Sequence, residues 1–273
     1  MPDQVHFEWL ARIGYSARGI VYILVGAMAL LLSSFGGRQT DQESALQIVL
    51  NQPFGWIWLA LIGLGLIGFI VWRLAQGILN ADDHPHNAKG YLIRIAMLIS
   101  AATYTGLASF ALRHALQLSI SGGSGNSRES WTGWLMQQPF GPYLVAVVGL
   151  AIIGGGVAQI VKGVKRRYLK YVNISPERNR VLDPVCVYGL AARGVIFLII
   201  GGFFLYAAWA VDPSQAGSTA EAMDWVRQLP FGSILYGLIA LGLFAFGAYG
   251  LIEARYRIVR TPELSDAKRP LKA

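Results

Sequence analysis

The stretch Asn51-Gln-Pro-Phe-Gly-Trp56 recurs twice in the chain, as Gln137-Gln-Pro-Phe-Gly-Pro142 and Gln228-Leu-Pro-Phe-Gly-Ser233. The prolines of the three copies are 86 and 91 residues apart. Each copy follows a short polar-to-amphipathic segment and precedes a long apolar run. A signal that returns at nearly constant spacing is typical of internal repeats. The sequence therefore predicts three copies of one structural unit.

Composition predicts a membrane protein. Of 273 residues, 54% are hydrophobic and only 14% are charged, against roughly 25% charged in soluble domains. Six apolar runs are each long enough to cross a bilayer, which takes about 20 residues; they lie at 18–36, 54–79, 92–112, 140–161, 187–210 and 231–252. We expect an all-α polytopic membrane protein whose six transmembrane helices form three repeated αα-hairpins in a pseudo-threefold arrangement. The predicted units are 10–80, 91–165 and 185–256, followed by a cytoplasmic tail at 257–273.

The lysines and arginines predict the orientation. Nineteen of the 23 fall at the termini and in the two even-numbered connections, and four fall on the other side. By the positive-inside rule both termini are cytoplasmic, in the bacterial plasma (inner) membrane. The net charge of +8 is then a topology signal rather than a sign of nucleic-acid binding. It also favours contact with anionic lipid headgroups on the cytoplasmic side.

The three outer connections share a pattern around Pro-Phe-Gly. Thr40-x-x-Glu43, Asn126-x-x-Glu129 and Ser218-x-x-Glu221 each match the capping box that begins a helix. Apolar and Trp positions follow each box, which predicts three short amphipathic helices at the outer interface. We expect the proline of each copy to start the next span at its first turn, where a missing amide costs least.

Arg18 and Arg193 stand in matching Ala-Arg-Gly sequences, at 17–19 and 192–194, whereas the middle unit has Ser100-Ala101 at that place. One interpretation is a snorkelling or structurally paired arginine. The other is a lipid or anion site, since guanidinium groups bind phosphate bidentately. The candidate residues for such a site are Arg18, Arg193, Lys165, Arg166 and Arg167.

Three further patterns favour structural explanations. Gln76, Lys162 and Glu253 occupy equivalent positions in the three second helices; they either pair across the axis or, as we prefer, are solvated at the interface. Gly63-Leu-Gly65-Leu-Ile-Gly68 lies inside a span, so it indicates helix packing and not a dinucleotide site. Asp82-Asp83-His84-Pro85-His86 is typical of a polar turn, because a zinc site needs three or four placed ligands. We expect neither a metal nor a cofactor.

The combination of Ala-Arg-Gly with Gln-x-Pro-Phe-Gly, or its variant, resembles the bacterial membrane family catalogued as domain of unknown function 1206. The resemblance covers about residues 10–256. It implies repeated two-helix modules, commonly three per chain. The middle unit departs from the pattern because it lacks Arg-Gly. No activity, cofactor or catalytic residue comes with the resemblance.

No nucleophile–base pair is visible, and no carboxylate lies in the middle of any apolar run. We therefore expect a non-enzymatic membrane module that binds lipid or a protein partner, the partner being another protein or further copies of the same chain. The alternative is a small channel or facilitator for ions or small solutes along the pseudo-threefold axis. Its candidate lining residues are Tyr22, Ser100 and Tyr104.

Overall fold

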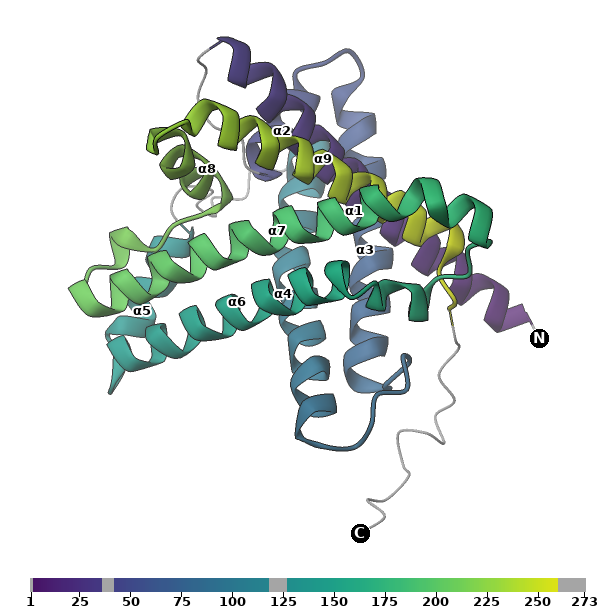
Figure 1. Ribbon diagram of the computed structural model, residues 1–273, viewed down its shortest axis with the longest axis horizontal. Helices are drawn as coiled ribbons and strands as arrows, with labels where there is room; N and C mark the ends of the chain where they lie inside the picture. The colour runs from purple at the N-terminus through teal and green to yellow at the C-terminus, as the bar shows by residue number, and fades with distance from the viewer. Residues whose placement is uncertain (1, 36–41, 118–126, 260–273) are drawn as a thin grey trace.

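The computed structural model describes residues 2–35, 42–117 and 127–259 (Figure 1). Six of its helices are long and apolar enough to cross a membrane, as the sequence predicted. They are α1 (Pro2–Phe35), α3 (Gly55–Ile78), α4 (Ala88–Ala115), α6 (Gly141–Val164), α7 (Pro176–Ala210) and α9 (Gly232–Tyr256). Between them lie the short helices α2 (Gln42–Leu50), α5 (Ser127–Met136) and α8 (Thr219–Gln228), and the 3-10 turns η1 (Arg167–Tyr171) and η2 (Pro213–Gln215). The all-α prediction is confirmed.

The tightest packing joins neighbouring repeats. The second span of each unit packs against the first span of the next, which gives the pairs α3–α4, α6–α7 and, closing the cycle, α9–α1. In Figure 1 helices α6 and α7 run side by side across the view, and helices α3 and α4 cross them steeply. Contacts within a unit, α1 with α3 and α7 with α9, are fewer, and α4 and α6 pack mainly on other repeats.

The Pro-Phe-Gly copies form three matching joints. In each, the Phe precedes the next span and has a left-handed backbone, with φ 59° at Phe54, 61° at Phe140 and 60° at Phe231. The rings point outward, with exposed fractions of 70%, 78% and 82%. The following Gly starts the span, and a Cβ on Gly55 would lie 2.3 Å from the carbonyl oxygen of Leu50. Only glycine allows this approach to the end of the short helix.

The prediction that proline opens the span is wrong by two residues. Each span begins at the glycine, because the left-handed Phe turns the chain after the proline and stops the helix from starting there. The predicted capping box is present at Ser218, whose hydroxyl accepts from the amide of Glu221 while the Glu221 carboxylate accepts from the Ser218 amide. Thr40 and Asn126 lie outside the described residues.

The main core lies where α1, α3 and α9 meet. Its largest buried side chains are aromatic, and Tyr15–Phe69 and Tyr22–Phe246 pack edge to face at centroid distances of 5.4 and 4.8 Å. A smaller cluster around Val145 and Phe204 lies between α6 and α7. The main core therefore sits directly beside the ends of α3, α6 and α9, where the polar side chains gather.

Candidate functional site

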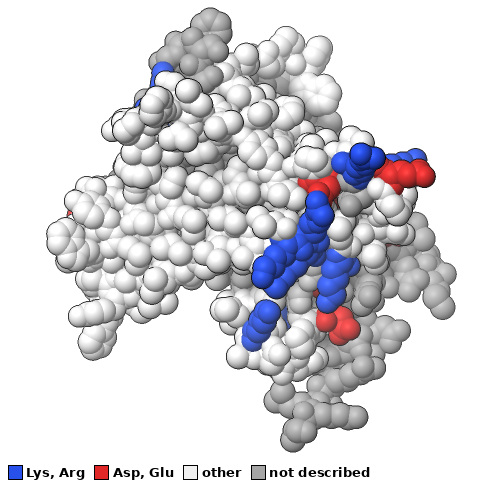
Figure 2. All heavy atoms as spheres, viewed as in Figure 1, with Lys and Arg blue, Asp and Glu red and all other residues white. Residues whose placement is uncertain are grey.

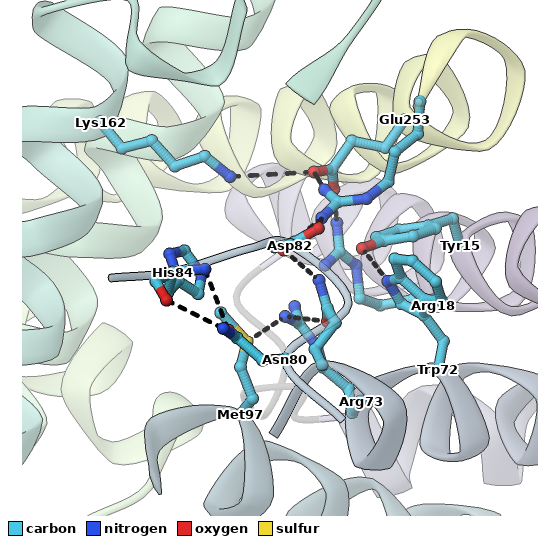
Figure 3. A network of polar contacts seen from close by, with 12 residues as sticks. Tyr15, Arg18, Trp72, Arg73, Asn80, Asp82, His84, Met97, Lys162 and Glu253 are labelled. Atoms are coloured by element: carbon cyan, nitrogen blue, oxygen red, sulfur yellow. Dashed lines mark hydrogen bonds and ion pairs between the residues drawn. The ribbon is translucent and has the colours of Figure 1, made fainter. Parts of the chain in front are cut away.

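A buried ionic network joins the ends of α3, α6 and α9 (Figure 3). Glu253 on α9 is its centre, with an exposed fraction of 2%. Its carboxylate accepts from Arg18 Nη2 of α1 at 2.7 Å and from Arg257 Nη1 at 3.0 Å. The Tyr249 hydroxyl donates to it at 2.7 Å, and Lys162 Nζ of α6 lies 3.8 Å away. One carboxylate thus contacts groups from α1, α6 and α9.

Asp82, in the connection from α3 to α4, is the second carboxylate of the network. It accepts from Arg257 Nη2 at 2.9 and 3.1 Å and from the Gln76 amide at 2.6 Å. Gln76 in turn accepts from Arg73 Nη1 at 3.0 Å. Because Arg257 contacts both carboxylates, it bridges the end of α9 to the α3–α4 connection.

The network carries more positive than negative charge. It contains two carboxylates and four cationic side chains: Arg18, Lys162 and Arg257 contact the carboxylates, and Arg73 joins the network through Gln76. Removing charges from water is costly unless each is paired and hydrogen-bonded. Aromatic faces supply part of the compensation: the Arg18 guanidinium lies 5.1–5.2 Å from the ring centroids of Tyr15, Phe69 and Phe246. The excess charge makes this end of the molecule a candidate for binding anions.

Arg18 is the most deeply buried of the candidate lipid-binding residues. Its exposed fraction is 3%, and its guanidinium is paired with Glu253. Of the two interpretations offered by the sequence, the structure corresponds to structural pairing. The reason is the packing of α1 directly on α9, which covers the side chain before it can reach the surface.

The preferred interpretation of Gln76 and Glu253 as solvated residues is wrong. Gln76 has an exposed fraction of 0% and Glu253 of 2%, while the Lys162 side chain is 31% exposed. Lys162 and Glu253 point toward each other (Figure 3), and Gln76 is linked to Glu253 through Asp82 and Arg257. Sequence equivalence was the signal for the cluster. The partners Arg73, Asp82, Tyr249 and Arg257 were missed, and Arg257, predicted to begin the tail, is buried.

Two arginines tie neighbouring repeats together at the same end. Arg12 Nη1 donates to the carbonyls of Ala254 and Arg255 at the end of α9. Arg94 donates in the same way to Gly77 and Ile78 at the end of α3. Cations at helix C-termini satisfy the last carbonyls and favour the helix dipole. These contacts fix the relative height of the paired helices around the network.

Arg193 and the candidate channel residues lie around an aromatic centre. Arg193 Nε donates to the Tyr22 hydroxyl at 3.1 Å. Tyr22 and Tyr104 are buried, with their rings 4.8 Å from Phe246 and 4.7 Å from Phe69, and Ser100 is half-buried on α4. Since these rings fill the region that the channel hypothesis requires to be open, the packing gives that hypothesis no support.

The candidate basic residues after α6 form an exposed surface on η1. Lys165, Arg166, Arg167 and Lys170 are exposed, and Figure 2 shows cationic atoms gathered at this end of the α6–α7 pair. Arg166 pairs with Asp183 of α7 at 2.8 Å. Beneath them the buried Tyr168 donates to Asp183 at 2.5 Å, and burial together with this hydrogen bond raises the pKa of Tyr168. The turn is thereby held against α7.

The segment Asp82–His86, predicted to be a polar turn, is held in place by burial and hydrogen bonds. His84 is buried, and its backbone is hydrogen-bonded on both sides to the amide of Asn80. Burial lowers the pKa of the His84 imidazole. An open pocket of about 210 Å³ lies beside it, lined by Ala81, Asp82, Asp83, Lys170, Tyr171 and Ile258. Among the described residues no three His, Cys, Asp or Glu side chains gather as a metal site.

Six apolar helices and a polar network at one end define a multi-pass α-helical membrane protein. A family described as "Domain of Unknown Function (DUF1206)" matches residues 13–80, 95–166 and 188–257, and the chain belongs to that family. It is 32% identical over 252 residues to the "Uncharacterized protein YxxB" of Bacillus subtilis (strain 168), covering 90% of each chain. No solved structure matches the chain. The resemblance seen in the motifs is confirmed.

Proposed function

We propose that this protein is a non-enzymatic membrane protein that binds anionic lipid headgroups through the η1 surface, defined as Lys165, Arg167 and Lys170. The observation that carries the proposal is that these cations are exposed and have no ion-pair partner among the described residues. They stand directly after the end of a candidate membrane span, Gly141–Val164. Charged groups at that height meet the headgroup layer of a bilayer.

The rigidity of η1 supports the proposal. Tyr168 anchors the turn from below. The chain after η1 is joined to the end of α9 by hydrogen bonds from Ile258 N to Tyr171 O at 3.0 Å and from Asn173 N to Tyr256 O at 2.8 Å. A surface already held in place loses less conformational entropy on binding. Each Lys or Arg near an anionic surface contributes about 1 kcal/mol, so three give roughly 100-fold in affinity.

The proposed orientation puts the η1 surface in the cytoplasm of a bacterium, facing the inner leaflet of the plasma membrane. The uneven distribution of Lys and Arg supports this topology. Single cysteines replacing Lys165 and Arg113, in a chain carrying Cys186→Ala, test it. Both positions are exposed in the structure. A membrane-impermeant thiol reagent should label them from opposite sides, and labelling of both from the same side would overturn the orientation.

The lipid test compares nanodiscs of phosphatidylcholine with nanodiscs containing phosphatidylglycerol. Lipids retained by the purified protein, identified by native mass spectrometry, should be enriched in phosphatidylglycerol. The triple variant Lys165→Gln, Arg167→Gln, Lys170→Gln should lose that enrichment, and Arg167→Gln alone should weaken it. Arg113→Gln is the matched control, because Arg113 is an exposed arginine at the far end of α4. Undiminished enrichment in the triple variant would refute the proposal.

A further inference from the structure

Two of the three inter-repeat helix pairs cross at equivalent positions of the repeat. In α1–α9 the backbones meet at Gly19 and Gly247, where a Cβ on Gly247 would lie 2.7 Å from the Gly19 carbonyl oxygen. In α6–α7 they meet at Gly194 and Gly156, where a Cβ on Gly156 would lie 2.7 Å from the Gly194 carbonyl oxygen. The two crossings occupy equivalent positions of the repeat. Residues at matching offsets from the two crossings therefore occupy corresponding backbone positions.

The ion pair beside the first crossing has no counterpart beside the second. Arg18 precedes Gly19, Glu253 follows Gly247 by six residues, and their charged atoms lie 2.7 Å apart. Beside the second crossing, Arg193 precedes Gly194 and Lys162 follows Gly156 by six residues. The position that holds a carboxylate in one pair holds a second cation in the other. Two like charges brought near one another are destabilising unless an anion lies between them.

Both cations turn to other groups. Lys162 Nζ lies 3.0 Å from the Tyr249 hydroxyl and 3.8 Å from the Glu253 carboxylate, which Arg18 and Arg257 already share. Arg193 uses only Nε, toward the Tyr22 hydroxyl, and its guanidinium stacks 4.6 Å from the centroids of Phe197 and Phe246. Among the described residues no carboxylate is within ion-pair distance of Arg193. Within the described part of the chain, no group accepts a hydrogen bond from its Nη1 or Nη2, so both can donate to an added acceptor.

The middle repeat also has small residues where the others have rings. Phe69 and Phe246 correspond to Gly155, and the buried Trp72 and Tyr249 correspond to the exposed Ala158. A Cβ on Gly154 would meet nothing within 4 Å. Because α4 does not pack closely on α6, this side of α6 is open, and its span is the least buried of the six. An external group can approach Lys162 from there.

We propose that Lys162 and Arg193 bind a phosphate group, which supplies the negative charge that Glu253 supplies in the equivalent pair. The planar guanidinium donates two parallel hydrogen bonds to phosphate oxygens, and the ammonium contributes a point charge. The phosphate belongs either to a lipid headgroup or to a free anion. This site is separate from the η1 surface and does not depend on it.

The experiment measures the thermal unfolding midpoint in two arms. In one arm, inorganic phosphate is titrated into protein in phosphatidylcholine nanodiscs; in the other, phosphatidylglycerol is added in phosphate-free buffer. At least one arm should raise the midpoint of the unmodified protein. Lys162→Gln and Arg193→Gln should each weaken the apparent affinity in that arm by about 10-fold to 100-fold, the effect of losing a charged hydrogen-bond partner. Arg193→Lys, which keeps the charge, should lose less.

The pattern of outcomes separates this site from the η1 surface. Arg113→Gln, at an exposed arginine of α4 that belongs neither to this site nor to the η1 surface, is the control and should keep the gain in midpoint. A gain only with inorganic phosphate identifies a soluble anion, and a gain only with phosphatidylglycerol identifies a lipid headgroup. If neither arm raises the midpoint, or if Lys162→Gln and Arg193→Gln keep the gain, the inference is wrong, whatever the η1 variants show.

Discussion

Glu253→Gln is the most severe single test of the buried network. The substitution keeps the shape of the side chain and removes its charge. Arg18, Arg257 and Lys162 then face a neutral amide, and the only carboxylate left in the network is Asp82, which Arg257 already binds at 2.9 Å. Because Glu253 is 2% exposed, water cannot replace the lost charge.

The expected cost follows from this geometry. Removing one partner of a buried ion pair costs about 3–5 kcal/mol, and the retained amide oxygen, which still accepts one hydrogen bond, favours the lower end. For a chain of this size about 3 kcal/mol lowers the unfolding midpoint by roughly 6–12 °C. Thermal unfolding in detergent, followed by the fluorescence of the tryptophans, measures the shift.

A double variant and a control make the result specific. Arg18→Gln combined with Glu253→Gln removes a cation and an anion together, so its loss should be about 1 kcal/mol or more smaller than the sum of the single losses. Glu177→Gln, in the exposed first turn of α7, should change the midpoint little. If Glu253→Gln behaves like Glu177→Gln, the network does not hold the repeats together.

Two further predictions concern packing and pH. Gly156→Ala should destabilise the protein by about 1–3 kcal/mol, because its Cβ would lie 2.7 Å from the Gly194 carbonyl oxygen. Gly154→Ala is the control and should not destabilise it, because its Cβ would meet nothing within 4 Å. Equal thermal unfolding midpoints for the two variants would contradict the close helix crossing at Gly156. Burial lowers the pKa of His84, so the unfolded chain binds more protons and stability should fall as pH drops below about 6.5. His84→Gln should reduce the dependence of the unfolding midpoint on pH, and His86→Gln, at an exposed histidine, should not. If His84→Gln leaves the pH dependence unchanged, other groups cause it.

The fold was predictable because its signals are local and repeated. Pro-Phe-Gly, the apolar runs and the capping box at Ser218 each act within a few residues, and their recurrence identified three units before any contact was known. The exact start of each span was not predictable. The left-handed backbone of Phe54 and its counterparts is set by the approach of the following glycine to the preceding short helix.

The site was predictable only in part. The equivalence of Gln76, Lys162 and Glu253 follows from the repeat register, but their burial depends on which spans pair. A periodic pattern shows where a residue lies along its helix, but it does not show which helix packs against it. Helix α9 packs most closely on α1, at the opposite end of the sequence. The contact between Asp82 and Arg257 joins residues 175 positions apart through loop geometry, and no local signal carries it.

Comparing the three repeats distinguishes the features that all of them share from the features in which they differ. The joints are alike in all three units, down to the backbone angle of the Phe and the glycine that follows it. The side chains beside the inter-repeat pairs differ. Arg18 contacts Glu253 in the α1–α9 pair, whereas the equivalent sequence positions hold Arg193 and Lys162 in α6–α7 and Ser100 and Gln76 in α3–α4. One pair is charge-balanced, one has excess positive charge and one is neutral. If these positions had only a structural role, a charge-balanced pair in each of the three repeats would fulfil it. We therefore expect ligand binding at the pair with excess positive charge.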